Sequence, residues 1–386
     1  MKNFSVDISR LAGLLLVGLV FNSPALATFY KFTELAPYTG GVRSNASAIN
    51  NLGQIVGNTD FNAPCFGCGG YTRATIWDGS TGAPLSTPTT NSYASDINDL
   101  GQVVGWLSVN YTTSREAVIW DNMLAPTTTL DTIYYYDSAV AINNHGQIVG
   151  NSAPLSNSYR KAVVWNSEAG TTYLGISSQA VDINDVGQVA GRIGSDVVIW
   201  TGGTATVLGD LDGGFSVAEA INNSGQAVGW SLAAGGYRAV LWKNTAAIDL
   251  GTLGGFSYAY GINNIGQIVG SFYAVDGMSH AFLWEDGALI DLNTLLENNI
   301  IAEGWLLTSA QDINDNGEIV GNALNRITGQ SSAFLLSMAT ISEPYSIALF
   351  CFGLTGIGVI RRRSVLAAHS DDSDRSSLRF RTGGVL

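Results

Sequence analysis

The first stretch of the chain that suggests a chemical function is DINDNGEIVG, at residues 312–321. It places side-chain oxygens at Asp312, Asn314 and Asn316 and then a glycine, Gly317, and an EF-hand calcium loop begins in this way. Such a loop also requires a carboxylate at its twelfth position, which is Ala323 here. The stretch therefore indicates a tight turn more strongly than a calcium loop.

The same pattern, Ile-Asn-Asn/Asp-x-Gly-Gln/Glu-x-x-Gly, recurs seven times, and these copies define repeats 1 to 7. Their first asparagines are Asn50, Asn98, Asn143, Asn184, Asn222, Asn263 and Asn314. The six intervals span 264 residues, a mean of 44, and this period is typical of propellers and solenoids. In each copy we expect the first glycine to take the left-handed position of a type I turn with a G1 bulge, and the Asn or Asp side chain to cap the turn.

Three repeats keep a metal hypothesis open, because each carries two aspartates. Repeats 2, 4 and 7 contain Asp-Ile-Asn-Asp, whereas the other four have Ala or Gly at the first of these positions and Asn at the last. Two nearby carboxylates repel each other unless something between them favours the charge. An arginine, a water network or Ca²⁺ would serve, so calcium is the one cofactor considered. Its candidate ligands are Asp96, Asp99, Asp182, Asp185, Asp312 and Asp315.

Each repeat contains four runs of strand length, separated by turn residues and without helical periodicity. The most regular run is β-branched or aromatic and ends in Trp in six repeats, as in RATIW at residues 73–77. A run such as AIDLGTLGG at 247–255 follows it. We predict an all-β fold for residues 28–340, namely a seven-bladed β-propeller of four-stranded blades.

The two ends of this region predict how the propeller closes. Repeat 7 has no Asp-Leu-Gly run after its third strand, but Thr33-Glu34-Leu35 aligns with Ile248-Asp249-Leu250 of an earlier repeat. We therefore expect Phe32–Leu35 to pair with Ala333–Leu336. This N-terminal strand would close the ring, because pairing the first and last segments hides the sheet edges.

The repeats resemble the HAF repeat, an extracellular repeat family named for the tripeptide His-Ala-Phe. His280-Ala281-Phe282 matches that tripeptide within MSHAFLWEDG, and the GINN-x-GQIVG pattern occurs in register with it. The resemblance covers nearly all of the region between the chain ends. It implies export and repetition, and it implies no settled biochemical activity.

The first 27 residues have the features of a secretory signal peptide. Lys2 and Arg10 precede or border a short apolar run, and Ala25-Leu26-Ala27 provides small residues for cleavage after Ala27. The alternative is an N-terminal membrane anchor, but the run is short for a bilayer core of about 30 Å.

The C-terminal residues 341–363 resemble a PEP-CTERM sorting signal of Gram-negative exported proteins, which implies a processing protease of the exosortase type. An apolar run at 345–360 follows Ser342, Glu343 and Pro344 and precedes Arg361, Arg362 and Arg363. The family usually has Pro-Glu-Pro and ends soon after the arginines, whereas this chain continues with a polar tail at 364–386. We expect a cell-surface or extracellular protein, held transiently or stably at the inner membrane by a helix of residues 345–360. A plain membrane anchor is the alternative.

The net charge of the region between the two chain ends excludes one class of partner. Residues 28–343 contain 10 basic and 27 acidic residues, a net charge of about −17, and this charge disfavours nucleic acid as a partner.

Cys65 and Cys68 lie in a Pro/Gly-rich loop of a chain that is expected to be exported. We expect a disulfide between them rather than a redox CxxC site.

No catalytic set emerges from the sequence. The histidines at 145, 280 and 369 have no metal spacing and complete no Ser/His/Asp triad. Most acids occupy equivalent positions in several repeats, whereas catalysis needs a unique constellation. We therefore predict a non-enzymatic binding or structural protein, linked to extracellular polysaccharide or surface proteins. The alternative is a carbohydrate-active enzyme, a glycoside hydrolase or lyase, with acids from separate blades; the long spacings around Cys65–Cys68 and Ile290–Trp305 are its candidate locations.

Overall fold

The computed structural model describes residues 30–62, 70–85, 91–108, 114–121, 128–131, 134, 136–154, 160–166 and 170–338. Within these ranges the regular secondary structure is almost entirely β-strand. The strands of repeats 1 to 3 are β2 (Arg43–Ile49), β3 (Ile55–Phe61), β4 (Tyr71–Asp78), β5 (Thr81–Pro84), β6 (Ser92–Ile97), β7 (Val103–Ser108), β8 (Arg115–Trp120), β9 (Thr128–Thr129), β10 (Tyr136–Ile142), β11 (Ile148–Ala153), β12 (Lys161–Asn166) and β13 (Gly170–Tyr173).

Repeats 4 to 7 continue the same order. Their strands are β14 (Ser178–Ile183), β15 (Val189–Ile193), β16 (Asp196–Thr201), β17 (Thr204–Val207), β18 (Ser216–Ile221), β19 (Ala227–Ala233), β20 (Gly236–Lys243), β21 (Ala246–Asp249), β22 (Ser257–Ile262), β23 (Ile268–Tyr273), β24 (Ser279–Glu285), β25 (Ala288–Asp291), β26 (Trp305–Ile313), β27 (Ile319–Asn325) and β28 (Ser331–Met338). The remaining strand, β1 (Tyr30–Leu35), precedes repeat 1.

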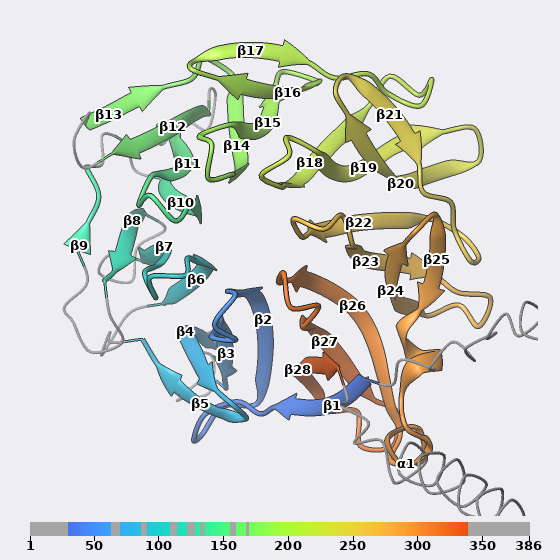
Figure 1. The fold of residues 1–386 in the computed structure, drawn as a ribbon. Helices are drawn as coiled ribbons and strands as arrows, with labels where there is room; N and C mark the ends of the chain where they lie inside the picture. The colour runs from blue at the N-terminus through green and yellow to red at the C-terminus, as the bar shows by residue number, and fades with distance from the viewer. Residues whose placement is uncertain are drawn as a thin grey trace, which may run out of the picture. The chain divides into compact units, whose positions relative to one another are not determined.

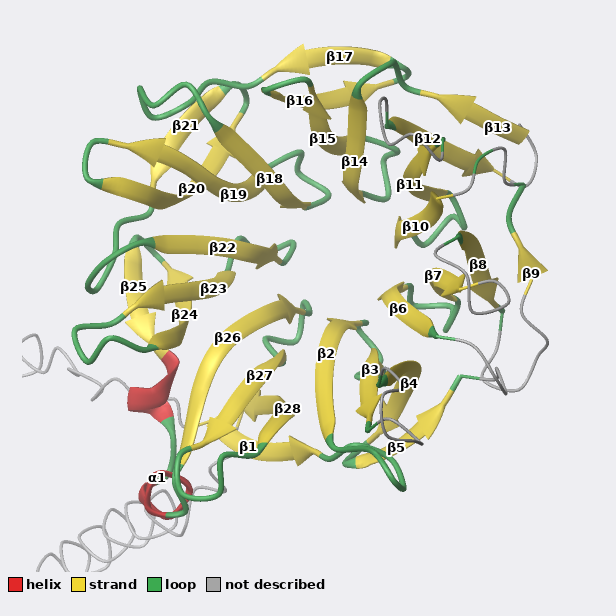
Figure 2. Ribbon diagram, turned by 180° about the vertical axis from the view of Figure 1, so that it is seen from behind, coloured by secondary structure: helices red, strands yellow, loops and turns green. Residues whose placement is uncertain are grey.

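The described strands form five four-stranded sheets and one eight-stranded sheet. The eight-stranded sheet combines repeats 2 and 3 through a single parallel pair, Tyr136 of β10 with Arg115 of β8. Within a repeat, antiparallel neighbours follow the chain, as in β14-β15-β16-β17. Figures 1 and 2 show the first strand of every repeat at a common centre, with the later strands further out.

The motif residues explain how the two inner strands of a repeat fit together. The last glycine of the motif lies on the second strand, close to the backbone of the first; a Cβ at Gly229 would collide with the carbonyl oxygen of Val217. Opposite this contact, the pairing of β18 with β19 shifts between Ala218 and Ala220, which marks a bulge at Glu219. All seven inner strands carry a bulge at the equivalent place.

The hydrophobic core is divided into seven clusters, each between adjacent repeats within the described part of the chain. The cluster between repeats 7 and 1 contains Leu35, Ile49, Trp77, Val320 and Ala333. The packing between the last and the first repeat is therefore of the same kind as the packing between neighbours in sequence.

The predicted pairing of the N-terminal strand is confirmed. Strand β1 runs antiparallel to β28, with Phe32 opposite Leu336 and Leu35 opposite Ala333, and β1 lies beside β28 in Figure 1. Ser44 of repeat 1 joins this arrangement, because its Oγ donates to the Leu35 carbonyl at 2.6 Å and accepts from the Ala333 amide at 2.9 Å.

The predicted membrane anchor requires correction. The helices of the described part are the 3-10 helix η2 (Leu292–Leu295) and α1 (Asn298–Ala302), and no helix there has the length and apolar character needed to cross a membrane. The predicted membrane anchor is therefore withdrawn, and with it the predicted location at the inner membrane. Residues 345–360, where the anchor was predicted, lie outside the described residues.

Candidate functional site

The first asparagines of the seven repeats form a closed ring of hydrogen bonds, here called the asparagine ring. Nδ2 of each donates to the backbone carbonyl of the first asparagine in the next repeat, over 2.9–3.2 Å. Asn314 of repeat 7 donates back to Asn50 of repeat 1. These side chains are only 3–4 % exposed, so the ring is a buried polar network in which every repeat holds the next.

Each ring asparagine also organises its own turn, as Asn222 illustrates. Its Oδ1 accepts from the amides of Ser224 at 3.1 Å and Gln226 at 3.0 Å, and its Nδ2 donates to Gln226 Oε1 at 2.9 Å. The amide of Gly225, at φ 72°, donates to the Asn222 carbonyl at 3.0 Å. The predicted turn is thus confirmed. Asparagine suits the position because it both accepts and donates, whereas an ionised aspartate only accepts.

The residues that follow the ring asparagines form a second closed circle. The backbone amide of each donates to the side-chain oxygen of its counterpart in the next repeat, over 2.8–2.9 Å. The members are Asn51, Asp99, Asn144, Asp185, Asn223, Asn264 and Asp315. Asn and Asp both offer the required oxygen, so either residue closes the circle.

The three aspartates of this circle are separated by asparagines. Oδ2 of Asp99 accepts from Nδ2 of Asn51 and of Asn144, both at 3.1 Å. Asp185 has the same environment between Asn144 and Asn223. Because repeats 2, 4 and 7 are never adjacent in the circle, no two carboxylates are neighbours and each charge receives amide donors.

The other three aspartates accept from backbone amides of two repeats. Asp182 accepts from the Ile183 amide through Oδ1 and from the Ile221 amide of the next repeat through Oδ2, both at 2.7 Å. Asp96 and Asp312 do the same within and beyond repeats 2 and 7. Three acids thereby serve six repeats, and the remaining one, repeat 6, has Gly261 at this position. This sharing explains why Asp alternates with Ala along the chain.

The pKa of each of these three carboxyl groups is raised. Desolvation raises the pKa of Asp96 to about 7, although the two backbone amides act in the opposite direction. Desolvation also raises the pKa of Asp182 and of Asp312, and the negative charges of Asp96 and Asp312 add to the effect on Asp182. The three groups therefore share one poorly hydrated interior near the centre of the repeats.

A central cavity of about 170 Å³ lies where the motifs converge. It is lined by the Ile-Asn-Asn/Asp segments of all seven repeats. Of the six candidate calcium ligands, Asp99, Asp185 and Asp315 line this cavity. Each of the six accepts a hydrogen bond from a backbone amide of an adjacent repeat. In the described ranges, no three His, Cys, Asp or Glu side chains are grouped as a metal site would need. The prediction of no cofactor, with calcium as the alternative, is not tested by these contacts.

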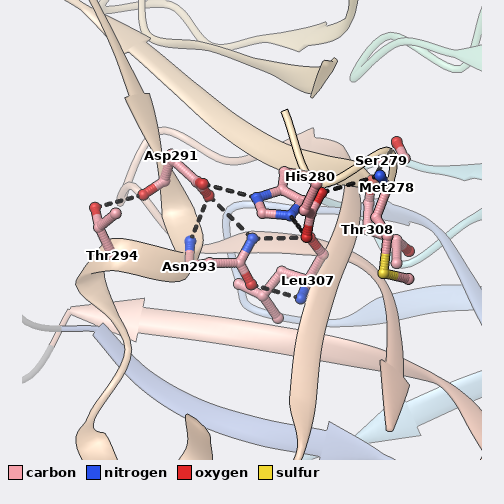
Figure 3. Close-up of polar contacts among 9 residues, drawn as sticks. Met278, Ser279, His280, Asp291, Asn293, Thr294, Leu307 and Thr308 are labelled. Carbon is pink, nitrogen blue, oxygen red and sulfur yellow. Dashed lines mark hydrogen bonds and ion pairs between the residues drawn. The ribbon is translucent and has the colours of Figure 1, made fainter. Parts of the chain in front are cut away.

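His280, the first residue of the HAF tripeptide, belongs to a cluster that the sequence did not predict (Figure 3). Its Nδ1 lies 2.8 Å from Asp291 Oδ2, and its Nε2 lies 3.3 Å from Asp276 Oδ2. Oδ1 of Asp291 accepts from the Asn293 side chain at 3.0 Å, and Asn293 in turn bonds the amide and carbonyl of Leu307 in repeat 7. The cluster fastens repeat 6 to repeat 7.

A second unpredicted feature, here called the aromatic cluster, lies at the strand ends remote from the asparagine ring. It comprises Phe215, Trp230, Tyr237, Phe256, Tyr258 and Tyr273 of repeats 5 and 6, joined by ring contacts of 4.9–6.3 Å. Phe256 is 41 % and Tyr273 49 % exposed. The sequence showed many aromatic residues, but it could not show that six from two repeats touch one another.

Several predicted sites lie outside the described residues. They are Cys65 and Cys68 of the expected disulfide, Ala27 of the expected signal cleavage, and Ser342, Glu343, Pro344, Arg361, Arg362 and Arg363 of the expected sorting signal. These expectations stay predictions.

Comparison with known proteins shows the fold. No family model and no curated protein sequence matches the chain. The β-propeller domain of the Trilobed protease from Pyrococcus furiosus, described as having an open velcro topology, is 10 % identical with a TM-score of 0.53, over 83 % of this chain and 98 % of that one. The acylaminoacyl peptidase of Pyrococcus horikoshii is 10 % identical with a TM-score of 0.51, over 81 % of this chain and 55 % of that one. The chain therefore has a β-propeller-like fold.

Proposed function

We propose that the described residues form a seven-bladed propeller closed by β1, and that it is a non-enzymatic, exported protein that binds extracellular polysaccharide. The seven-membered asparagine ring and the seven interfacial core clusters support the blade number. The pairing of β1 with β28 supports the closure. In this proposal the repeats belong to the HAF type and the chain ends are export and sorting signals, with an exosortase-type protease as processing partner.

The observation that supports a binding role is that the polar motif side chains hold the repeats together, whereas the aromatic cluster is partly exposed. The aspartates of the repeat motif accept hydrogen bonds from neighbouring repeats, so they serve the scaffold. The aromatic cluster at the other strand ends includes two strongly exposed rings. Exposed aromatic residues with a polar edge are typical of binding surfaces.

A glycan array tests the binding role directly. The purified full chain is applied to polysaccharides of different charge and linkage, and we expect retention by at least one class. A folded protein that binds none of them would refute the proposed function.

A disulfide trap tests the closure. Lys31 lies opposite Ser337 in the pairing of β1 with β28, so Lys31→Cys with Ser337→Cys should oxidise to a cross-link. The background has Cys65, Cys68 and Cys351 replaced by serine. Lys31→Cys with Ser332→Cys is the matched control, because that pair is out of register. Equal cross-linking of the two pairs would contradict the closure.

The enzymatic alternative has one observation in its favour. Glu219 is the only acid at the bulge position of the inner strands, and desolvation raises its pKa, as is common for general acids. An assay for new reducing ends on bound polysaccharide separates the two functions. Cleavage by the native chain that Glu219→Gln abolishes would establish the enzyme, whereas we expect no cleavage by either.

A further inference from the structure

The aromatic cluster differs from other aromatic groups at the same strand ends in what covers its rings. In repeats 1 to 3 a basic side chain lies near a ring: Arg73 is 5.0 Å from the centre of Tyr71, Arg115 is 4.0 Å from Trp106, and Lys161 is 5.2 Å from Tyr173. Among the described residues no lysine or arginine lies over a ring of the aromatic cluster. Arg238, next to Tyr237, donates instead to the Gly255 carbonyl at 3.2 Å, so it covers no ring face of the cluster.

Trp106 and Trp230 show this difference at equivalent positions. They end the matching segments VVGW (103–106) and AVGW (227–230). Trp106 stacks on Tyr93 at 4.6 Å in addition to its contact with Arg115. Trp230 instead meets Tyr237 and Tyr258 at nearly perpendicular angles. Trp106 is contacted by Tyr93 and Arg115 of its own repeat, whereas Trp230 belongs to the partly exposed aromatic cluster of repeats 5 and 6.

An acid lies directly beside the cluster. Glu219, in the bulge of β18, accepts from Trp230 Nε1 at 3.3 Å. The equivalent positions hold Ser47, Ser95, Val140, Val181, Tyr260 and Gln311. Desolvation raises the pKa of Glu219. Desolvation also raises the pKa of Tyr260, and the negative charge of Glu219 adds to that effect. A cation bound beside Glu219 would therefore favour the charged form of this poorly hydrated carboxyl group.

We infer that the aromatic cluster and Glu219 bind amino sugars, as a segment of a polysaccharide whose pyranose rings carry ammonium groups. The apolar faces of the pyranoses pack on the exposed aromatic rings. The ammonium groups contact the uncovered ring faces and Glu219. The net charge of about −17 on residues 28–343 attracts such a polycation over a longer range. This inference rests on the proposed polysaccharide-binding function and assigns its ligand class.

Three hexasaccharides with the same β-1,4 backbone test the ligand class. They consist of glucosamine, N-acetylglucosamine and glucose, and calorimetric titration of the full chain measures the affinity for each. We expect the glucosamine hexamer to bind at least about tenfold more tightly than the other two, because only its ammonium groups make cation–π and ion-pair contacts. A tenfold difference corresponds to about 1.4 kcal/mol. Equal affinities for the three would overturn the assignment.

Matched variants test the location. Trp230→Ala and the exposed-site variant Tyr273→Ala should each weaken glucosamine-hexamer binding, the former by about tenfold or more, whereas Trp106→Ala should leave it unchanged. Glu219→Gln should remove the preference for glucosamine over glucose. Thermal unfolding of each variant verifies folding, and Tyr273→Ala keeps the test valid if Trp230→Ala does not fold.

The outcomes separate the inference from the proposed function. Glycan binding that is unaffected by both Trp230→Ala and Tyr273→Ala refutes the site and leaves the proposed function standing. Absence of binding to every glycan refutes both.

Discussion

The two ends of the inner strands differ in how far their side chains repeat. At the asparagine ring, the same residue makes the same bonds in all seven repeats, and the buried amides find partners in the next repeat. At the opposite strand ends, repeat 2 has a stacked pair, Tyr93 with Trp106, and repeats 5 and 6 share six rings. The side chains that repeat identically hold the repeats together, whereas the side chains that differ between repeats form the proposed binding surface.

The difference has an energetic basis. A buried polar network stabilises a protein only when all members are satisfied, so a ring residue cannot vary without leaving a buried partner unpaired. Exposed rings such as Phe256 and Tyr273 carry no such obligation. Substitutions at the two ends should therefore have effects of different size and kind.

The largest effect is expected from a ring asparagine. Asn184→Leu removes the bonds to the Asn222 carbonyl and to the amide and Oε1 of Gln188. The Asn222 carbonyl keeps the Gly225 amide, whereas both part-buried Gln188 groups lose Asn184 as a partner. At about 1–3 kcal/mol for each, the free energy of unfolding should fall by about 2–6 kcal/mol in chemical denaturation. Ser224→Ala, at an exposed turn position, is the control; an equal loss there would show that the ring has no special role.

The turn glycines should rank next. Gly266 has φ 90°, and a Cβ atom added to it would meet only open space, so Gly266→Val isolates backbone strain. We expect a loss of about 1–3 kcal/mol, measured by thermal unfolding. Gly266→Asn is the matched variant, because Asn tolerates the left-handed region, and its loss should be smaller. Equal losses for Val and Asn would argue against strain.

The carboxyl group of Asp96 should make stability depend on pH. Its folded pKa of about 7 lies above the unfolded value of about 3.9, so the folded chain holds the proton more tightly. The stabilisation is complete below about pH 4 and is lost as the pH rises through 7. Between pH 5.5 and 7 we expect a loss on the order of 1–2 kcal/mol.

Asp96→Ala is the control for this pH dependence, since Ala48, Ala141 and Ala220 occupy the position in other repeats. Its unfolding free energy should vary less with pH over the same interval. A native chain that becomes more stable from pH 5.5 to 7 relative to this variant would reverse the expected sign.

Calcium should have the smallest effect. Amides of adjacent repeats already bond Asp312 and Asp315, so we expect the melting temperature to be the same with Ca²⁺ and with EDTA. A rise of several degrees with Ca²⁺ would revive the metal hypothesis by mass action. Loss of that rise in Asp312→Asn with Asp315→Asn would locate the ion.

The repeats and their turns could be predicted because they depend on local sequence. The turn requires a positive φ at Gly225, which lies only three residues after Asn222. The alignment of Thr33–Leu35 with Ile248–Leu250 likewise needs only the comparison of two short segments. The membrane anchor at 345–360 was predicted from an apolar run followed by three arginines. It is withdrawn, because no helix in the described part of the chain has the length and apolar character to cross a membrane.

Beyond the pairing of β1 with β28, only the tertiary structure decided which side chains of different repeats meet. The pairing of Asp312 with the Ile49 amide joins residues 263 positions apart, and the contact of His280 with Asp291 depends on how β24 and β25 lie against each other. The sequence determined seven turns, each with an asparagine and a glycine, because those requirements are local. It did not determine that the aspartates and asparagines form a closed circle, because one of its contacts joins repeat 7 to repeat 1. Nor did it determine that rings from repeats 5 and 6 touch, because those contacts depend on how the two repeats pack.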